Sequence, residues 1–229
     1  MKNYDYIIVG AGASGLMMAY RMSKDSFFET KKILIIDKEK KSINDRTWCF
    51  WEKNNGEWDD VLAKTWDKIQ FKSDIHSLEE SILPYQYKMI RSKKIYDKIW
   101  NQLDQNPQIT FIASNVLEIQ QAESSAIVIT DAGSFSSTVV LNSILFSNKY
   151  KLQTKYPVLQ QHFVGFFIKT TEDSFNDDLA TFMDFKIPQK GNTRFMYILP
   201  FSKNEALFEY TLFSEKLLPD SEYEAEIES

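Results

Sequence analysis

The sequence has little of several features that mark particular classes of protein. A single cysteine, Cys49, stands among 229 residues, which excludes an internal disulfide framework and a multi-cysteine metal site. No apolar run approaches the roughly 20 residues that a membrane-spanning helix needs. The first residues lack the long apolar core of a secretory signal. These absences predict a cytoplasmic protein.

Positive charge and histidine are also scarce. The 27 lysines and arginines are outnumbered by 32 acidic residues, and the net charge of −5 gives no footprint for nucleic acid. The two histidines, His76 and His162, lie far apart and have no partner at metal-ligand spacing, so we predict no metal site. Cys49 has no spaced histidine partner, which favours a packed thiol over a nucleophile.

Alternation of strand and helix patterns opens the chain. Residues 6–9 (YIIV) and 33–36 (ILII) have the β-branched, apolar composition of buried strands. Between them, GAGASG at 10–15 leads into good helix formers. This order predicts a βαβ unit of a parallel sheet.

The glycines fit the G-x-G-x-x-G fingerprint of dinucleotide-binding proteins. Gly10 allows the tight turn, Gly12 lets the backbone approach a pyrophosphate, and Gly15 permits close packing of helix on strand. Ser14 can donate to phosphate or cap the helix, whose N-terminus carries partial positive charge. Asp37 ends the second strand at the spacing expected of a ribose-binding acid.

The rest of the chain predicts a meander and then a second sheet. Residues 92–103 have a helical stripe with Ser92 as N-cap, and the short run 144–147 suits a return to the parallel sheet. We predict a Rossmann-like domain over 1–159 and part of an antiparallel sheet over 160–229, ending in a frayed acidic tail. The other predicted strands are 68–72, 109–114, 116–119, 126–130, 135–141, 163–169, 180–187, 194–199 and 206–213.

The stretch DRTWCFWE, residues 45–52, places three aromatic rings around Cys49. It could be core with charged edges or the wall of a pocket. Arg46 could pair with its acidic neighbours on the surface or reach a cofactor. Trp48, Trp51 and Glu52 could line a substrate pocket, with core packing as the alternative for the two tryptophans.

Four segments together give the chain a resemblance to a known family. DYIIVGAGASGL, DRTWCFWE, YKMIRS at 87–92 and the region from QHFVGFFI to ALFEYTLFS resemble a bacterial lycopene β-cyclase over nearly the whole chain. The early βαβ unit followed by a meander likewise resembles the FAD domain of flavoprotein hydroxylases and reductases. The implied fold is α/β, with a Rossmann-like FAD domain beside an antiparallel substrate sheet.

The resemblance implies a cofactor, a substrate and a location. FAD would be active in its reduced form, with NAD(P)H as the source of electrons and no net electrons passing to substrate. Lys38 and Arg46 would join the glycine loop and Asp37 as cofactor contacts. The substrate would be lycopene or a related linear carotenoid, taken up through peripheral contact with a membrane.

Ring closure in that family needs a proton on a terminal alkene carbon. Glu209, in the apolar strand ALFEYTLFS, matches the glutamate of the family's motif and is the first candidate for this acid; a solvent-facing role is its alternative. Asp184, between Met183 and Phe185, is the second candidate, with a structural role as its alternative. Glu205 and Glu215 are expected to be solvated.

Two alternative functions stay open. A prenyl reductase or monooxygenase of the same fold would consume NAD(P)H in proportion to product. An inactive remnant would bind nucleotide weakly or not at all. The family's Gly-Asp segment, which completes the flavin site, is absent from this sequence, so a chain truncated at its C-terminus is expected.

Overall fold

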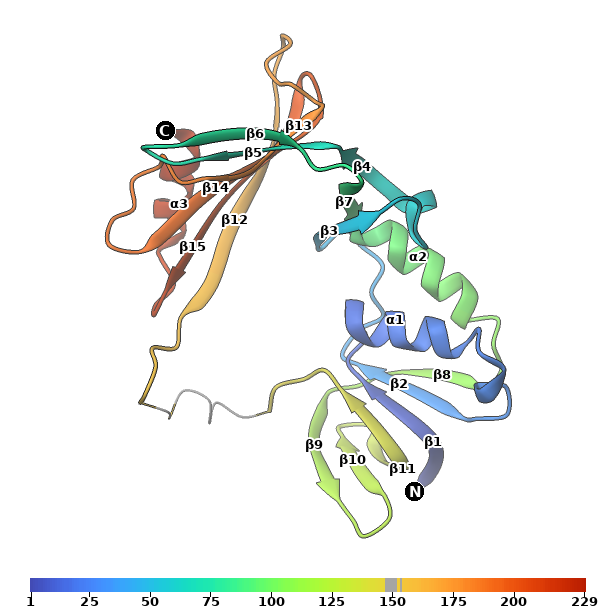
Figure 1. Cartoon of the computed structure of the whole chain (residues 1–229). Coiled ribbons are helices and arrows are strands. Elements are labelled where there is room, and N and C mark those ends of the chain that lie inside the picture. The colour runs from blue at the N-terminus through green and yellow to red at the C-terminus, as the bar shows by residue number, and fades with distance from the viewer. Residues whose placement is uncertain (147–151, 153) are drawn as a thin grey trace. The chain divides into compact units, whose positions relative to one another are not determined.

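The computed structural model describes residues 1–146, 152 and 154–229 (Figure 1). The chain folds into two compact units. The nucleotide unit, as we call it, comprises Met1–Thr47 and Arg91–Asn148. The sheet unit comprises Trp48–Ile90 and Lys149–Ser229.

One mixed sheet of six strands forms the centre of the nucleotide unit. Its order is β8-β2-β1-β11-β10-β9, with the first four strands parallel and the last two antiparallel. The apolar runs predicted as strands form its buried middle, and helix α1 packs on β1. The strands are β1 (Lys2–Val9), β2 (Ile33–Asp37), β8 (Ile109–Ala113), β9 (Val116–Gln121), β10 (Ala126–Thr130) and β11 (Gly133–Asn142).

Strand β11 corrects one prediction. Its first half pairs antiparallel with β10 and most of its length pairs parallel with β1, so the meander itself returns to the parallel sheet. Residues 144–146, predicted as the returning strand, form no strand, and residue 147 lies outside the described residues. A ten-residue strand that serves both neighbours leaves no place beside β1 for another.

The described part of this unit holds two α-helices, α1 (Ala13–Met22) and α2 (Ser92–Leu103). The predicted stripe on α2 is confirmed, since Ile95, Ile99 and Leu103 are buried. The prediction of Ser92 as N-cap is wrong: Arg91 holds that position, and Asn44 Oδ1 accepts from the Lys93 N–H at 3.0 Å. A side chain from a distant loop caps this helix, which local sequence does not reveal.

A second six-stranded sheet forms the sheet unit, in the order β12-β15-β14-β13-β5-β6, beside a three-stranded sheet β3-β7-β4. One pair in the larger sheet, β13 with β5, is parallel; the others are antiparallel. The strands are β3 (Thr47–Lys53), β4 (Leu62–Trp66), β5 (Lys68–Lys72), β6 (Ser77–Ser81), β7 (Tyr85–Arg91), β12 (Gln160–Lys169), β13 (Leu179–Asp184), β14 (Thr193–Ser202) and β15 (Glu205–Ser214).

The structure divides the chain differently from the predicted boundary between 159 and 160. Residues 48–90 belong with the later sheet because β5 pairs with β13 over five residues. Pairing between strands more than 100 residues apart leaves no local signal in the sequence.

The larger sheet of this unit has two unlike faces. On the front face, Leu199 and Leu207 pack with Trp66, Tyr87 and Met89 from the three-stranded sheet. On the back face lies helix α3 (Asp220–Glu228), which packs against β12 and β15 (Figure 1). The tail that we predicted as frayed is therefore a helix, held by a buried cluster of Met196, Tyr210, Leu212 and Tyr223.

Candidate functional site

The glycine loop leads from β1 into α1 through a backbone that its glycines make possible. Gly10 has φ +99°, a conformation that residues with side chains rarely adopt. A Cβ on Gly15 would lie 1.9 Å from the Gly10 carbonyl oxygen. The first and third glycines are thus required by the fold alone.

Gly12 differs, because a Cβ built on it would meet no atom of the described residues within 4 Å. Gly12 is also the N-cap of α1 and makes no side-chain capping hydrogen bond, while the first turn holds no acidic residue. Ser14 in that turn is exposed. An open glycine at an uncapped, positively polarised helix end fits a phosphate group.

Asp37 lies beside this loop, as the fingerprint predicts. Its Oδ2 accepts a hydrogen bond from the Ala11 N–H at 2.6 Å, and Oδ1 accepts from the Glu39 N–H at 3.3 Å. The carboxylate is therefore fixed against the loop and keeps further lone pairs for a ribose hydroxyl. Lys38, the next residue, is exposed.

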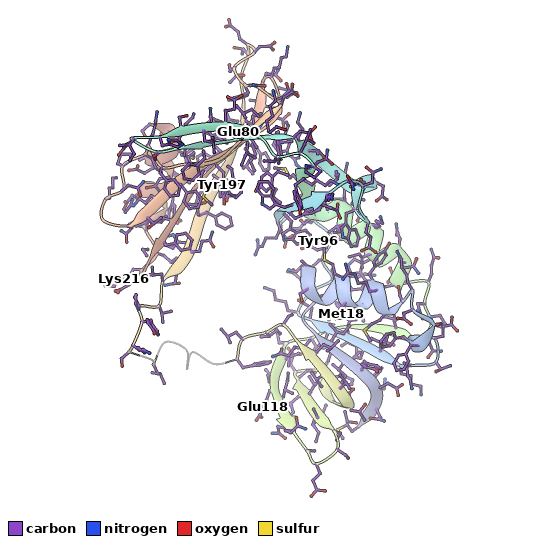
Figure 2. The ribbon with its side chains drawn as sticks, in the orientation of Figure 1. Met18, Glu80, Tyr96, Glu118, Tyr197 and Lys216 are labelled. Atoms are coloured by element: carbon purple, nitrogen blue, oxygen red, sulfur yellow. The ribbon has the colours of Figure 1, made fainter. Side chains whose placement is uncertain are left out.

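The start of DRTWCFWE is anchored to α2. Asp45 Oδ1 accepts from the Tyr96 hydroxyl at 3.0 Å and lies 3.0 Å from Ser92 Oγ (Figure 2 labels Tyr96). The Ser92 N–H donates to the Arg46 carbonyl at 2.9 Å, which joins the two backbones. The exposed Arg46 side chain folds back, and its Nη1 donates to the Asp45 carbonyl at 2.7 Å.

The remainder of the octapeptide is strand β3, so its side chains alternate between two sides. Trp51 and Cys49 lie on one side, where the Trp51 ring is 5.0 Å from Tyr87 and 5.3 Å from Phe182. Trp48 shares the other side with Glu52. Neither predicted alternative, hydrophobic core or pocket wall, therefore describes the whole octapeptide, because the two sides of β3 have different surroundings.

Glu52, predicted in a substrate pocket, is bound to a buried cation. Lys88 Nζ lies 3.0 Å from Glu52 Oε2, 2.6 Å from Asp59 Oδ1 and 2.9 Å from the Asn54 carbonyl. Burial lowers the pKa of Lys88, but the hydrogen bonds to the two carboxylates outweigh it and raise that pKa overall. With 1% of its side chain exposed, Lys88 has an acceptor for each of its three donors.

Glu209 stands in the middle of β15 on the front face. Its neighbours in register are Gly165 on β12 and Tyr197 on β14. Burial raises the pKa of this carboxyl group, and the Thr211 hydroxyl, 3.4 Å from Oε1, opposes the rise weakly. Within the part of the chain that the structure describes, Glu209 forms no salt bridge, which suits an acid that keeps its proton.

Three further titratable groups surround Glu209. Burial raises the pKa of Cys49 to about 12, and the charge of Glu209 adds to that shift. The pKa values of Tyr87 and Tyr197 are also raised by burial, with a contribution from Glu209 (Figure 2 labels Tyr197). Cys49 is the packed thiol that the sequence predicts, and it stays neutral with both tyrosines near neutral pH.

Asp184, the second predicted acid, lies elsewhere on the sheet. It is in register with Met196, whose side chain packs on the back face, and its Oδ2 lies 3.5 Å from Lys72 Nζ. Its Oδ1 accepts from the Lys186 N–H at 2.9 Å. The structure therefore gives Asp184 a hydrogen-bonding and ion-pairing role and does not bring it to Glu209.

The sequence alone did not identify Tyr87, Tyr197 and Gly165 as neighbours of Glu209. The pairing of β12, β15 and β14 would have identified the latter two, because partners in register share a face. Tyr87 comes from a different sheet, and nothing in the sequence indicated that it would lie near Glu209.

Among the residues that the structure describes, no group of three or more metal-ligating side chains gathers, and no helix is long and apolar enough to cross a membrane.

The sequence of this chain is similar to a known protein family and to proteins of two plants. The family model of the lycopene cyclase protein matches residues 5–229. The lycopene beta cyclase of Nicotiana tabacum is 25% identical over 90% of this chain, and the capsanthin/capsorubin synthase of Capsicum annuum is 24% identical over 91%. The chain spans 43% of the length of each of these relatives.

Solved structures share the fold at low sequence identity. A geranylgeranyl bacteriochlorophyll reductase-like protein from Thermoplasma acidophilum matches 100% of this chain and 61% of its own, at 12% identity and a TM-score of 0.65. The probable FAD-dependent monooxygenase pqsL from Pseudomonas aeruginosa matches 98% of this chain and 63% of its own, at 10% identity and the same TM-score. The predicted fold, a Rossmann-like domain of the flavoprotein kind with a second sheet, is confirmed.

Proposed function

The chain belongs to the lycopene cyclase protein family, and we propose that it serves a lycopene β-cyclase reaction, closing β-ionone rings on lycopene or a related linear carotenoid. The observation that carries the proposal is Glu209, a largely buried carboxyl group on the front face that has no cationic partner among the described residues. Cyclisation is an isomerisation, so every atom and electron of the substrate is retained.

In the proposed reaction Glu209 donates its proton to a terminal alkene carbon. A neighbouring double bond attacks the resulting cation and closes the ring. Transfer of a proton from the ring carbon to the Glu209 carboxylate then forms the new double bond and restores the acid. Burial keeps the acid protonated at the working pH, at the cost of acid strength. Stabilisation of the cation must offset that cost, and the face of Trp51, a partly exposed ring that packs on Tyr87, would suit the task.

Expression in a lycopene-accumulating bacterium tests the proposal. A chain that cyclises lycopene turns the red cells orange, and carotenoid chromatography measures the product. Glu209→Gln, which keeps the shape but cannot donate this proton, is expected to lower product formation about 100-fold or more. Asp184→Asn is the matched control and should stay near the unsubstituted chain; normal cyclisation by Glu209→Gln sinks the proposal.

A redox reaction is the alternative for this fold. A prenyl reductase or monooxygenase would consume NAD(P)H in proportion to product, whereas cyclisation needs it only to keep a flavin reduced. The ratio of NAD(P)H consumed to product formed therefore separates the two functions. A chain that yields no product and binds no FAD would instead be a remnant without activity.

We infer that FAD is the cofactor and that the glycine loop holds its pyrophosphate. Gly12 leaves open space, the N-terminus of α1 supplies N–H donors, and Asp37 is fixed where a ribose hydroxyl can donate to it. Lys38 and Arg46 supply positive charge. When bound and reduced, FAD would supply negative charge that favours a cationic intermediate.

A pair of glycine substitutions tests the cofactor proposal. Gly12→Ala adds a methyl group that contacts none of the described residues, so the melting temperature should be unchanged while FAD affinity falls about tenfold. Gly15→Ala, by contrast, would strike the Gly10 carbonyl and should destabilise the fold. Flavin fluorescence measures binding, and full FAD affinity in Gly12→Ala would remove the loop from the cofactor site.

The proposed location follows from the substrate. A long hydrocarbon resides in membrane, so a cyclase working on it would dock at the membrane surface from the cytoplasm. Flotation of the chain with lipid vesicles tests that docking directly.

A further inference from the structure

Gly165 lies directly beside the proposed acid. It is in register with Glu209 on the adjacent strand, and a Cβ built on it would lie 3.6 Å from Glu209 Cβ. That Cβ would also meet Leu207 Cδ1 at 3.1 Å, a flexible group that can shift slightly. Gly165 has no positive φ that demands glycine, so the backbone does not explain its identity.

Two exposed rings flank this glycine on the same face of β12. Phe163 and Phe167 are 55% and 52% exposed, although both are large apolar side chains. They lie two residues to either side of Gly165, so roughly 13 Å of strand separates their Cα atoms, with no side chain of β12 between them on that face. Gly165 therefore leaves a gap between two aromatic side chains along this face of β12, and we call that gap the slot.

The opposite approach to Glu209 is covered. Tyr197, its neighbour on β14, has its ring 5.8 Å from Phe182, and Phe182 in turn contacts Trp51 and Tyr87. Glu209 therefore stands where the covered part of the front face meets the open part, and the slot begins on its open side.

We propose that this slot admits the end of a linear polyene to Glu209, and that the absence of a side chain at residue 165 is the specificity-determining feature that allows it. This inference rests on the proposed function and names how its substrate reaches the acid. A side chain at residue 165 would occupy the space between the rings and stand over the Glu209 carboxyl group.

The chemistry of the slot selects its occupant. Phe163, Gly165 and Phe167 present no charge and no hydrogen-bonding side chain, so a polar or ionic ligand would lose its hydration there without compensation. A flat, conjugated hydrocarbon loses nothing by leaving water and can lie against aromatic faces. The raised pKa of Glu209 fits the same occupant, because a neutral acid does not oppose an apolar ligand.

Substitution of Gly165 in the full 229-residue chain tests the slot. Gly165→Val fills it with a β-branched side chain that favours strand structure, so folding should be retained. The probe is phytofluene, a fluorescent linear polyene with acyclic ends, in phosphatidylcholine vesicles. Its binding is followed by energy transfer from the tryptophans, of which Trp51 lies against the front-face ring Tyr87. We expect the variant to bind the probe about tenfold more weakly than the unsubstituted chain.

Gln161→Val is the matched control, since Gln161 is exposed on the same face of the same strand but outside the slot. Its binding should stay within about twofold of the unsubstituted chain. Should Gly165→Val fail to fold, Gly165→Ala, whose methyl needs only a small shift of Leu207, is expected to show a smaller loss in the same direction.

Equal probe binding by the folded Gly165 variants and the unsubstituted chain overturns the inference, as does failure of the unsubstituted chain to bind the probe. Loss of binding in Gln161→Val to the same extent also overturns it, because the effect would then belong to the strand. The proposed function is judged separately by cyclisation in Glu209→Gln, so the two failures are distinguishable.

Discussion

Glu209 and Tyr210 are neighbours in β15, yet they point to opposite faces of one sheet and meet opposite conditions. The Tyr210 hydroxyl on the back face accepts a hydrogen bond from Arg194 Nη1 at 2.8 Å, in a cluster closed by α3. Arg194 also lies 3.1 Å from Glu222 of that helix. Glu209 on the front face has the Thr211 hydroxyl at 3.4 Å and an open slot beside it.

The back face also satisfies its histidine fully. The Tyr223 hydroxyl of α3 lies 2.5 Å from His162 Nδ1, and Ser214 Oγ lies 2.8 Å from Nε2. Because the Ser214 hydroxyl donates to the Lys216 carbonyl, Nε2 carries the proton and Nδ1 accepts from Tyr223. Burial lowers the pKa of His162, which keeps this ring neutral. One face is built to hold a helix, and the other leaves an acid without a charged partner.

The largest expected difference between the faces concerns stability. Leu212 on the back face is fully buried, so Leu212→Ala should lower the free energy of unfolding by about 2 to 5 kcal/mol. Phe163→Ala on the front face removes a larger side chain that is already half exposed, and its effect should lie within about 0.5 kcal/mol. Urea unfolding followed by circular dichroism measures both.

Equal losses in the two variants would break the comparison. They would mean that Phe163 packs against something that buries it, and that the slot is closed in solution. A small loss in Leu212→Ala alone would show instead that α3 and its cluster contribute little to the unit.

The sequence predicted this molecule best where local pattern decides structure. The glycine loop, Asp37 and most of the strands follow from spacing and alternation, because each depends on residues close together in the chain. The sequence did not predict β3, β4, β6 and β7, which include all three strands of the smaller sheet. The stripe of Ile95, Ile99 and Leu103 likewise needed only helical period.

Prediction failed where distant residues decide. The cap of α2 comes from Asn44, the unit of residues 48–90 is fixed by pairing with β13, and Glu52 is bound by Lys88 from β7. The acidic tail was predicted as frayed because its partners, among them Arg194 and His162, lie far back in the sequence. Local composition carries no record of such contacts.

The same limit applies to the site. Glu209 could be singled out by its place in an apolar strand and by resemblance. The slot could not, because it arises from Gly165 meeting Glu209 across two strands 44 positions apart. Asp184 has equally apolar neighbours in the sequence. Its register with Met196 is what shows that it lies on the back face of the sheet, opposite to Glu209.

A smaller expected difference between the faces is the pH dependence that Glu209 gives to the free energy of unfolding. Burial raises the pKa of Glu209, so the folded protein holds this proton to a higher pH than the unfolded chain does. The resulting stability is fully present below the unfolded pKa and is lost as pH rises through the folded pKa. Glu209→Gln cannot ionise, so its free energy of unfolding should fall less than that of the unsubstituted chain over this window.

Urea unfolding at a series of pH values from acidic to neutral measures the difference. Thr211→Val sharpens the test, because it removes the Thr211 hydroxyl, which lowers the Glu209 pKa, while keeping the shape of a buried side chain. In that variant the pH-dependent loss should extend to higher pH than in the unsubstituted chain. Parallel curves for Glu209→Gln and the unsubstituted chain would show that Glu209 is as well solvated as an ordinary surface acid, and the contrast with the closed back face would then be one of packing alone.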